Sequence, residues 1–236
     1  MPTVTIEGTP TAMVIAPHPD DAESGAGGTI ATLLKQGCKV IVVICTNGDK
    51  GTQRRDLPPK DLAKIREAEQ QEASKVLGVT ALHMLGFPDQ GLEDDDLFRE
   101  KIVRLIRQYR PDMVFTMDPS RPYIIHRDHR MTGRVTLDSV FPTARDPLPY
   151  PQHLVDGLEP HKVRHVYMWG TENADSYFDV SETLDLKLKA LFCHRSQMGE
   201  MGDASRTERW KKRYEELGEK AGVKYAEAFK HIELPG

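Results

Sequence analysis

The residues best equipped for chemistry are 16–23, which read Ala-Pro-His-Pro-Asp-Asp-Ala-Glu and follow the apolar run 12–16. A second polar cluster, His-Arg-Asp-His at 126–129, follows the apolar run 113–117. Histidines and carboxylates that lie close together are the groups that bind catalytic metal ions. Either cluster alone would equally fit an ordinary polar loop, but the presence of both favours a site.

Three of these side chains would suit a zinc ion. A catalytic zinc ion is usually held by three protein ligands and keeps one position open for water. His18, Asp21 and His129 would provide two imidazoles and one carboxylate. Because bound zinc lowers the pKa of its water to about 7, a neighbouring carboxylate can accept the proton at neutral pH. Asp20 is the candidate for this base, and its alternative is a helix cap or a solvated surface group.

The second cluster offers one further histidine. The spacing of His126 and His129 fits one helical turn, which would place both imidazoles on one face. One could bind metal while the other faces the substrate. His126 could then stabilise an oxyanion or protonate a departing amine, particularly if Asp128 favours its charged form. The alternative is a plain ion pair between His126 and Asp128.

Composition narrows the class of protein. The chain has 236 residues, 32 basic and 36 acidic, well interspersed, with a formal net charge of −4. Without a basic stripe, nucleic acid is not an expected partner. No basic segment precedes a long apolar stretch, so we expect neither a signal peptide nor a membrane span, and predict a cytoplasmic protein. Three cysteines, Cys38, Cys45 and Cys193, fit a reducing compartment.

The hydrophobic pattern predicts an α/β fold, a doubly wound, Rossmann-like, mostly parallel sheet with helices on both faces, in one domain over 1–236. Continuous apolar runs indicate strands buried on both faces, and they alternate with helical periodicity. In such sheets ligands bind outside the carboxyl ends of the strands, where both polar clusters fall. The predicted strands are 12–16, 40–45, 81–85, 113–117 and 166–169, and the predicted helices are 29–36, 60–77, 97–109, 183–195 and 207–220.

The segment 142–160 is rich in proline, including Pro147, Pro149 and Pro151. Proline disfavours a regular helix or a central strand, so we predict a long surface excursion. Such a segment is either a wall of the binding site or a plain connector.

The pairing of His-Pro-Asp-Asp at 18–21 with His-x-Asp-His at 126–129 resembles the LmbE-like, or PIG-L, family of metal-dependent N-deacetylases. The resemblance covers most of the chain. Further elements that match in type and order are Gly25–Thr29, Cys45–Gly51, Arg66-x-x-Glu69, Leu77-Gly78, Leu85–Asp89, Thr132–Arg134, His194-x-Ser196-Gln197 and Tyr225–Phe229.

The resemblance implies roles for the residues of both clusters. Asp20 would be the general base, and His126 the electrophilic or acid group with Asp128 as its partner. The metal would be zinc, with ferrous iron as the alternative. The implied metal ligands are His18, Asp21 and His129.

Two positions outside this set also follow from the resemblance. Arg66 would reach the sugar of the substrate, although it could instead pair with Glu69 along its helix. The carboxylate that usually follows Asp-Asp directly is absent, because Ala22 stands there and Glu23 comes one place later.

The implied reaction is hydrolysis of an acetamido group on a small molecule, commonly N-acetylglucosamine or a conjugate of it, which releases acetate and a free amine. One alternative is an amidase that acts on a thiol-sugar conjugate. Another is a non-catalytic protein that binds metal or a sugar conjugate, and Asp20 argues against it because a structural site needs no base. Relatives form several assemblies, so a homo-oligomer stays open.

Overall fold

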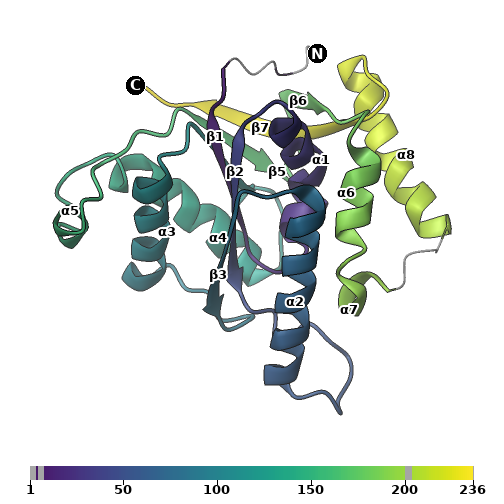
Figure 1. Ribbon diagram of the computed structural model, residues 1–236, viewed down its shortest axis with the longest axis horizontal. Coiled ribbons are helices and arrows are strands. Elements are labelled where there is room, and N and C mark those ends of the chain that lie inside the picture. The colour runs from purple at the N-terminus through teal and green to yellow at the C-terminus, as the bar shows by residue number, and fades with distance from the viewer. Residues whose placement is uncertain (1–3, 5–7, 200–203, 236) are drawn as a thin grey trace.

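A seven-stranded sheet forms the centre of the molecule (Figure 1), with the strand order β3-β2-β1-β4-β5-β7-β6. The computed structural model describes residues 4, 8–199 and 204–235. Strands β1 to β5 pair in parallel, β7 is antiparallel to β5, and β6 is antiparallel to β7. The strands are β1 Thr11–Ala16, β2 Lys39–Thr46, β3 Ala81–Phe87, β4 Met113–Met117, β5 His165–Trp169, β6 Ser176–Asp179 and β7 Ala226–Glu233.

Helices cover both faces of the sheet, and Figure 1 shows α1, α2, α6 and α8 on one side and α3, α4 and α5 on the other. Alternate residues of β1 enter different cores: Val14 packs with α1, α2 and α6, whereas Ile15 packs with α3 and α4. The predicted doubly wound, mostly parallel fold is therefore confirmed. The helices are α1 Asp21–Lys35, α2 Pro59–Leu77, α3 Asp96–Tyr109, α4 Arg127–Asp138, the π-helical turn η1 Ser139–Thr143, α5 Gln152–Val155, α6 Leu184–Leu191, α7 Arg195–Met198 and α8 Ala204–Ala221.

The five predicted strands are present, but β6 and β7 were not predicted. The burial of β7 alternates only partly, and charged residues such as Glu227 and Lys230 interrupt its apolar run. Its partner β6 has four residues, which is too short for a clear pattern. The prediction of one helix over 183–195 was also wrong in one respect, because α6 ends at Leu191 and α7 begins at Arg195. None of the helices in the described part of the chain is long and apolar enough to span a membrane.

Helix α1 begins at Asp21, eight residues before the start predicted at Thr29. The glycines of its first turns argued against a helix, since glycine lowers helix propensity. Their role is close packing: a Cβ on Gly25 would lie 2.6 Å from the indole of Trp169, and one on Gly28 would lie 2.7 Å from Val180. Packing against the sheet thus overrides helix propensity. As a result, Asp20 and Asp21 of the first motif lie at the start of a helix.

The proline-rich excursion is fastened to α3 by Arg107, which is buried. The excursion contains the short helix α5, although its prolines predicted no regular helix. The guanidinium donates hydrogen bonds to five backbone carbonyl groups of this segment, at Thr143, Ala144, Asp146, Pro149 and Tyr150. One side chain of α3 therefore joins carbonyl groups along residues 143–150 of this stretch.

We predict that Arg107→Leu lowers the free energy of unfolding by about 3 kcal/mol or more, because one buried and four partly buried carbonyl groups lose their donor. Urea denaturation followed by circular dichroism measures it. The matched control is Gln108→Leu at an exposed position of the same helix, with an expected change within about 0.5 kcal/mol. Equal stability of the two variants would contradict this account of the excursion.

Candidate metal centre and catalytic site

The two polar clusters meet at the carboxyl ends of β1 and β4, which are neighbours in the sheet. The ring centroid of His18 lies 4.7 Å from that of His126 and 5.2 Å from that of His129. Residues more than a hundred positions apart in the chain thus form one site, as the sequence predicted from strand ends alone.

The three predicted metal ligands converge on a single point. Nδ1 of His18 lies 3.0 Å from Oδ2 of Asp21, and Nε2 of His129 lies 3.3 Å from the same oxygen. One donor atom from each residue lies within 4.8 Å of the others. His18 is buried, whereas Asp21 and His129 are half-buried, so the group is accessible from one side. Two imidazoles and a carboxylate with one open side fit a catalytic zinc ion.

The other ring nitrogen of His18 faces two further carboxylates. Nε2 lies 3.0 Å from Oδ2 of Asp128 and 3.2 Å from Oδ1 of Asp89. The carboxylate of Asp128 also accepts the backbone N–H groups of Gln90, at 2.7 Å, and Leu92, at 3.2 Å. A carboxylate that accepts the far N–H of a metal-binding histidine fixes its tautomer and ring orientation. Asp128 and Asp89 therefore hold His18 with Nδ1 toward the predicted metal position.

Asp128 was expected to be the partner of His126, and the structure pairs it with His18 instead. Asp128 lies in the first turn of α4 and is fully buried, whereas His126 precedes the helix in extended backbone and is exposed. A second group of possible metal donors, His18, Asp89, His126 and Asp128, also lies within 4.8 Å. Asp128 is less suited to bind metal, because its oxygens already accept two backbone N–H groups.

The carboxylates around His18 stabilise positive charge. Burial lowers the pKa of His18, but the hydrogen bonds with Asp128, Asp21 and Asp89 outweigh it and raise that pKa to about 11. Burial raises the pKa of Asp21, and the hydrogen bond with His18 and the charge of His129 outweigh it, so the net shift is downward. The surrounding carboxylates favour positive charge at this position, and a metal ion that binds Nδ1 of His18 must displace its proton.

Asp20, the predicted base, has an unusual backbone conformation. It is the N-cap of α1 with φ 101° and ψ −24°, in a region that costs a non-glycine residue energy. Its backbone N–H donates to Oε1 of Gln70 at 3.2 Å, and its Oδ2 accepts from Arg66 at 3.3 Å. Burial and the charge of Asp21 raise the pKa of Asp20 to about 7, against the opposing charge of Arg66. A carboxyl group with a near-neutral pKa can accept a proton from water.

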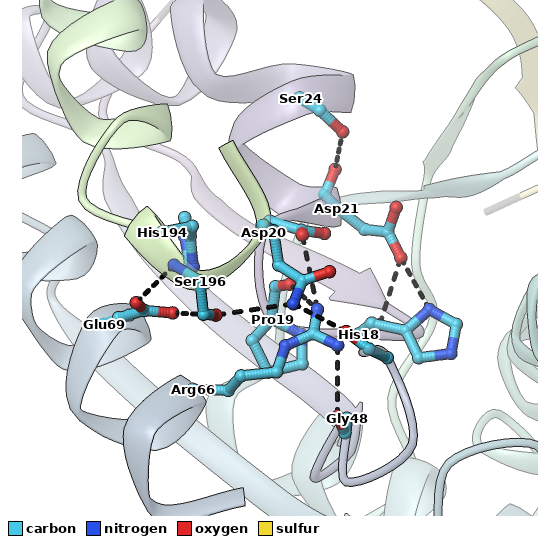
Figure 2. A network of polar contacts seen from close by, with 12 residues as sticks. His18, Pro19, Asp20, Asp21, Ser24, Gly48, Arg66, Glu69, His194 and Ser196 are labelled. Atoms are coloured by element: carbon cyan, nitrogen blue, oxygen red, sulfur yellow. Dashed lines mark hydrogen bonds and ion pairs between the residues drawn. The ribbon is translucent and has the colours of Figure 1, made fainter. Parts of the chain in front are cut away.

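Arg66 is only 3% exposed and lies beneath the loop that carries Asp20 (Figure 2). Its Nη2 donates to the carbonyl oxygen of Pro19 at 2.6 Å, and its Nη1 donates to that of Gly48 at 3.2 Å. A Cβ on Gly48 would lie 2.6 Å from this guanidinium, and one on Gly51 would lie 2.5 Å from it, so both glycines make room for the arginine. A contact of Arg66 with substrate stays a prediction.

The alternative ion pair of Arg66 with Glu69 is wrong. Glu69 turns the other way and accepts hydrogen bonds from the backbone N–H of Ser196, at 2.8 Å, and from its hydroxyl, at 2.6 Å (Figure 2). Helix α2 thus holds the loop after β1 with one residue and the start of α7 with another.

Three buried polar residues form a network at this site, and one of them, Gln70, was not singled out from the sequence. Nε2 of Gln70 donates to Oε1 of Glu23 at 2.7 Å, and Nε2 of His194 lies 3.3 Å from Oε2 of the same carboxylate. All three side chains are fully buried. Glu23, which stands one place later than the usual carboxylate, therefore belongs to the network beneath Asp20. The available signal was helical spacing, because Gln70 follows Arg66 by one turn.

The doubly wound fold and the His-Asp-His group at the strand ends, with the half-buried Asp20 adjacent to Asp21, fit an enzyme of the metal-dependent amide hydrolase class. A family model described as PIG-L, GlcNAc-PI de-N-acetylase, matches residues 13–140. The chain belongs to the PIG-L family.

Named relatives agree with this class. The chain is 35% identical to a diacetylchitobiose deacetylase of Thermococcus kodakarensis, over 80% of this chain and 70% of the relative. It is 32% identical to a probable N-acetyl-alpha-D-glucosaminyl L-malate deacetylase 2 of Bacillus cereus, over 78% of this chain and 82% of the relative. The structure of N,N'-diacetylchitobiose deacetylase from Pyrococcus horikoshii matches with a TM-score of 0.89 and 33% identity, covering 96% of this chain and 85% of that one. The sequence-based expectation of an N-deacetylase is confirmed at the level of the family.

We predict that Gln70→Leu lowers kcat for amide hydrolysis on the order of tenfold to a hundredfold, because Asp20 loses the acceptor that holds its strained backbone. Metal content should not change, since Gln70 contacts none of the three predicted ligands. The measurements are acetate release, metal analysis and the φ angle of Asp20 in a crystal structure of the variant.

The control for this variant is Gln71→Leu, because Gln71 is the exposed neighbour on the same helix. It should keep wild-type kcat. Wild-type kcat in Gln70→Leu as well, with Asp20 still in the left-handed region, would show that this hydrogen bond does not position the base.

Proposed function

We propose that the protein is a zinc-dependent hydrolase that removes the acetyl group from the nitrogen of N-acetylglucosamine in a small-molecule conjugate. One observation carries the proposal: His18, Asp21 and His129 present donor atoms within 4.8 Å of one another, and the half-buried Asp20 is adjacent to Asp21 in the chain. The substrate class is supported by the relatives, whose names specify diacetylchitobiose and N-acetylglucosaminyl malate.

Zinc is preferred because catalytic zinc sites commonly use two imidazoles and one carboxylate. Ferrous iron accepts the same donors, so metal analysis of the purified protein decides between them. When bound, zinc supplies a Lewis acid that activates water and polarises an amide carbonyl.

Asp20 takes the proton of the attacking water in this proposal. Its pKa of about 7 leaves the carboxylate ready to accept a proton at neutral pH, and the protonated acid can return it to the leaving amine. Arg66 and Gln70 hold the side chain and the backbone of Asp20 respectively, so the base keeps one orientation.

In this proposal His126 acts on the substrate rather than on the metal. Its ring is exposed, and within the described residues it forms no hydrogen bond with a carboxylate, since Asp128 is engaged by His18. It can therefore donate a hydrogen bond to the carbonyl oxygen as negative charge develops there, or protonate the amine. Asp128 acts through His18, whose orientation it fixes.

The proposal also covers the organisation of the protein. We treat residues 1–236 as one domain, because a single sheet separates both cores. The cytoplasmic location stays a prediction from the sequence.

We predict that Asp20→Asn keeps its metal and loses kcat on the order of a hundredfold or more, because the amide cannot accept a proton. His129→Ala should lose metal as well as activity, because only two of the three ligands remain. Metal analysis and assays of acetate and free amine on N-acetylglucosamine conjugates measure both effects.

His161→Ala is a suitable control, because His161 hydrogen-bonds to the carbonyl of Pro111 away from the site. It should keep both metal and activity. If zinc-loaded wild-type protein releases acetate from none of the conjugates, the proposed function is wrong. If Asp20→Asn turns over at the wild-type rate, only the assignment of the base is wrong.

A further inference from the structure

A cavity of about 250 Å³ adjoins the predicted metal site on the side of β5 and α8. His129 contributes to its wall, so the cavity opens directly beside one of the three predicted ligands. Its remaining walls come from the ends of β4 and β5, from β7, from the first turns of α1 and from α8. A substrate whose amide lies at the metal site can therefore extend a second part into this cavity.

Both tryptophans of the chain line the cavity, together with Tyr214. Trp169 is nearly buried and fits against Gly25, whose missing side chain leaves room for the indole. Trp210 is half-buried and stacks on Tyr214 with ring centroids 6.1 Å apart. Aromatic faces of this kind provide rigid apolar contact for a ligand.

The charge of the one acidic residue on the cavity wall is compensated by a buried lysine. Glu227 is fully buried and forms an ion pair with the buried Lys187. Its oxygens also accept the backbone N–H groups of Gly28, at 3.0 Å, and Thr29, at 2.7 Å. The ion pair and these hydrogen bonds therefore reduce the repulsion between this carboxylate and an anion in the cavity.

Two arginines give the cavity a positive charge. Arg121, after β4, and Arg213, on α8, are exposed and line both this cavity and an adjoining hollow of about 430 Å³. Glu172 and Glu216 border the hollow, yet in the described part of the chain neither arginine forms an ion pair within 4.0 Å. Guanidinium groups bind carboxylates and phosphates through paired hydrogen bonds.

We propose that this cavity binds an anionic group attached to the N-acylated sugar, a carboxylate or a phosphate, through Arg121 and Arg213, with Trp210 in apolar contact. The inference rests on the proposed function and narrows its substrate class from N-acetylglucosamine conjugates in general to those with negative charge. A neutral second sugar would leave both arginines without a counter-charge.

The test is a binding titration with zinc-loaded Asp20→Asn protein, and tryptophan fluorescence is the measured signal. Both tryptophans line the cavity, so the signal reports its occupancy without turnover. The probes are N-acetylglucosamine 1-phosphate, N-acetylglucosaminyl L-malate and N,N'-diacetylchitobiose, which carry a phosphate, carboxylates and no charge. We expect at least one anionic probe to bind about tenfold tighter than the neutral one, which corresponds to about 1.4 kcal/mol. The anion that does so identifies the group.

Arg121→Ala and Arg213→Ala should each raise the Kd of that anion about tenfold, since each removes a charge-assisted contact. The Kd of the neutral probe should rise far less in both variants. Lys212→Ala is the matched control, because it removes the same charge from an exposed position beside Arg213 and lies outside both cavities. It should change the Kd by less than about twofold.

Equal affinity for all three probes, or an unchanged Kd for the anion in both arginine variants, would overturn the inference. Acetate release by the wild-type enzyme is measured in parallel on the same compounds. No release from any of them would contradict the proposed function, whereas the fluorescence titration would still decide what the cavity binds.

Discussion

The parallel pairing of β1 with β4 is the constraint on which the site depends. Ala12, Met13 and Val14 lie opposite Met113, Val114 and Phe115, so both strands end at the same edge of the sheet. Polar residues follow the carboxyl end of each strand, and the register of β1 against β4 brings these residues together. The shared histidine, His18, then joins the two segments: its Nδ1 faces Asp21, and its Nε2 faces Asp128. A shift of the register would move the predicted metal ligands apart and would also disturb both cores, because alternate residues of β1 enter different ones.

Helix α2 acts as a second support for the same loop. Arg66 and Gln70, one turn apart, hold the carbonyl of Pro19 and the amide of Asp20, and these contacts stabilise a backbone conformation that costs a non-glycine residue energy. The strain is local, and the burial around it is extensive. Glu23 and His194 lie behind Gln70, so the position of Asp20 depends on three segments distant in sequence.

Charge is distributed unevenly around the site. Carboxylates surround His18 and favour a cation at the predicted metal position, whereas arginines border the cavity toward α8. Glu227, on the wall of this cavity, forms a buried ion pair with Lys187, and the pair contributes no net charge. Replacing a buried ion pair by apolar residues is often neutral for stability, so the pair by itself is weak evidence for a stabilising role. The two regions can thus attract opposite charges within one substrate-binding site.

The sequence alone determined the five parallel strands, the edge at which the polar clusters lie and the residues that could bind metal, because hydrophobic period and strand ends are local properties. It could not determine that α1 starts at Asp21, since glycines with poor helix propensity are favoured there only by the indole of Trp169 packing on Gly25. It also could not pair Asp128 with His18 or bring Gln70, Glu23 and His194 beneath Asp20. Those contacts join residues far apart in the chain, and only the packing of α2, α4 and α6 onto the sheet decides which of them lie within hydrogen-bonding distance.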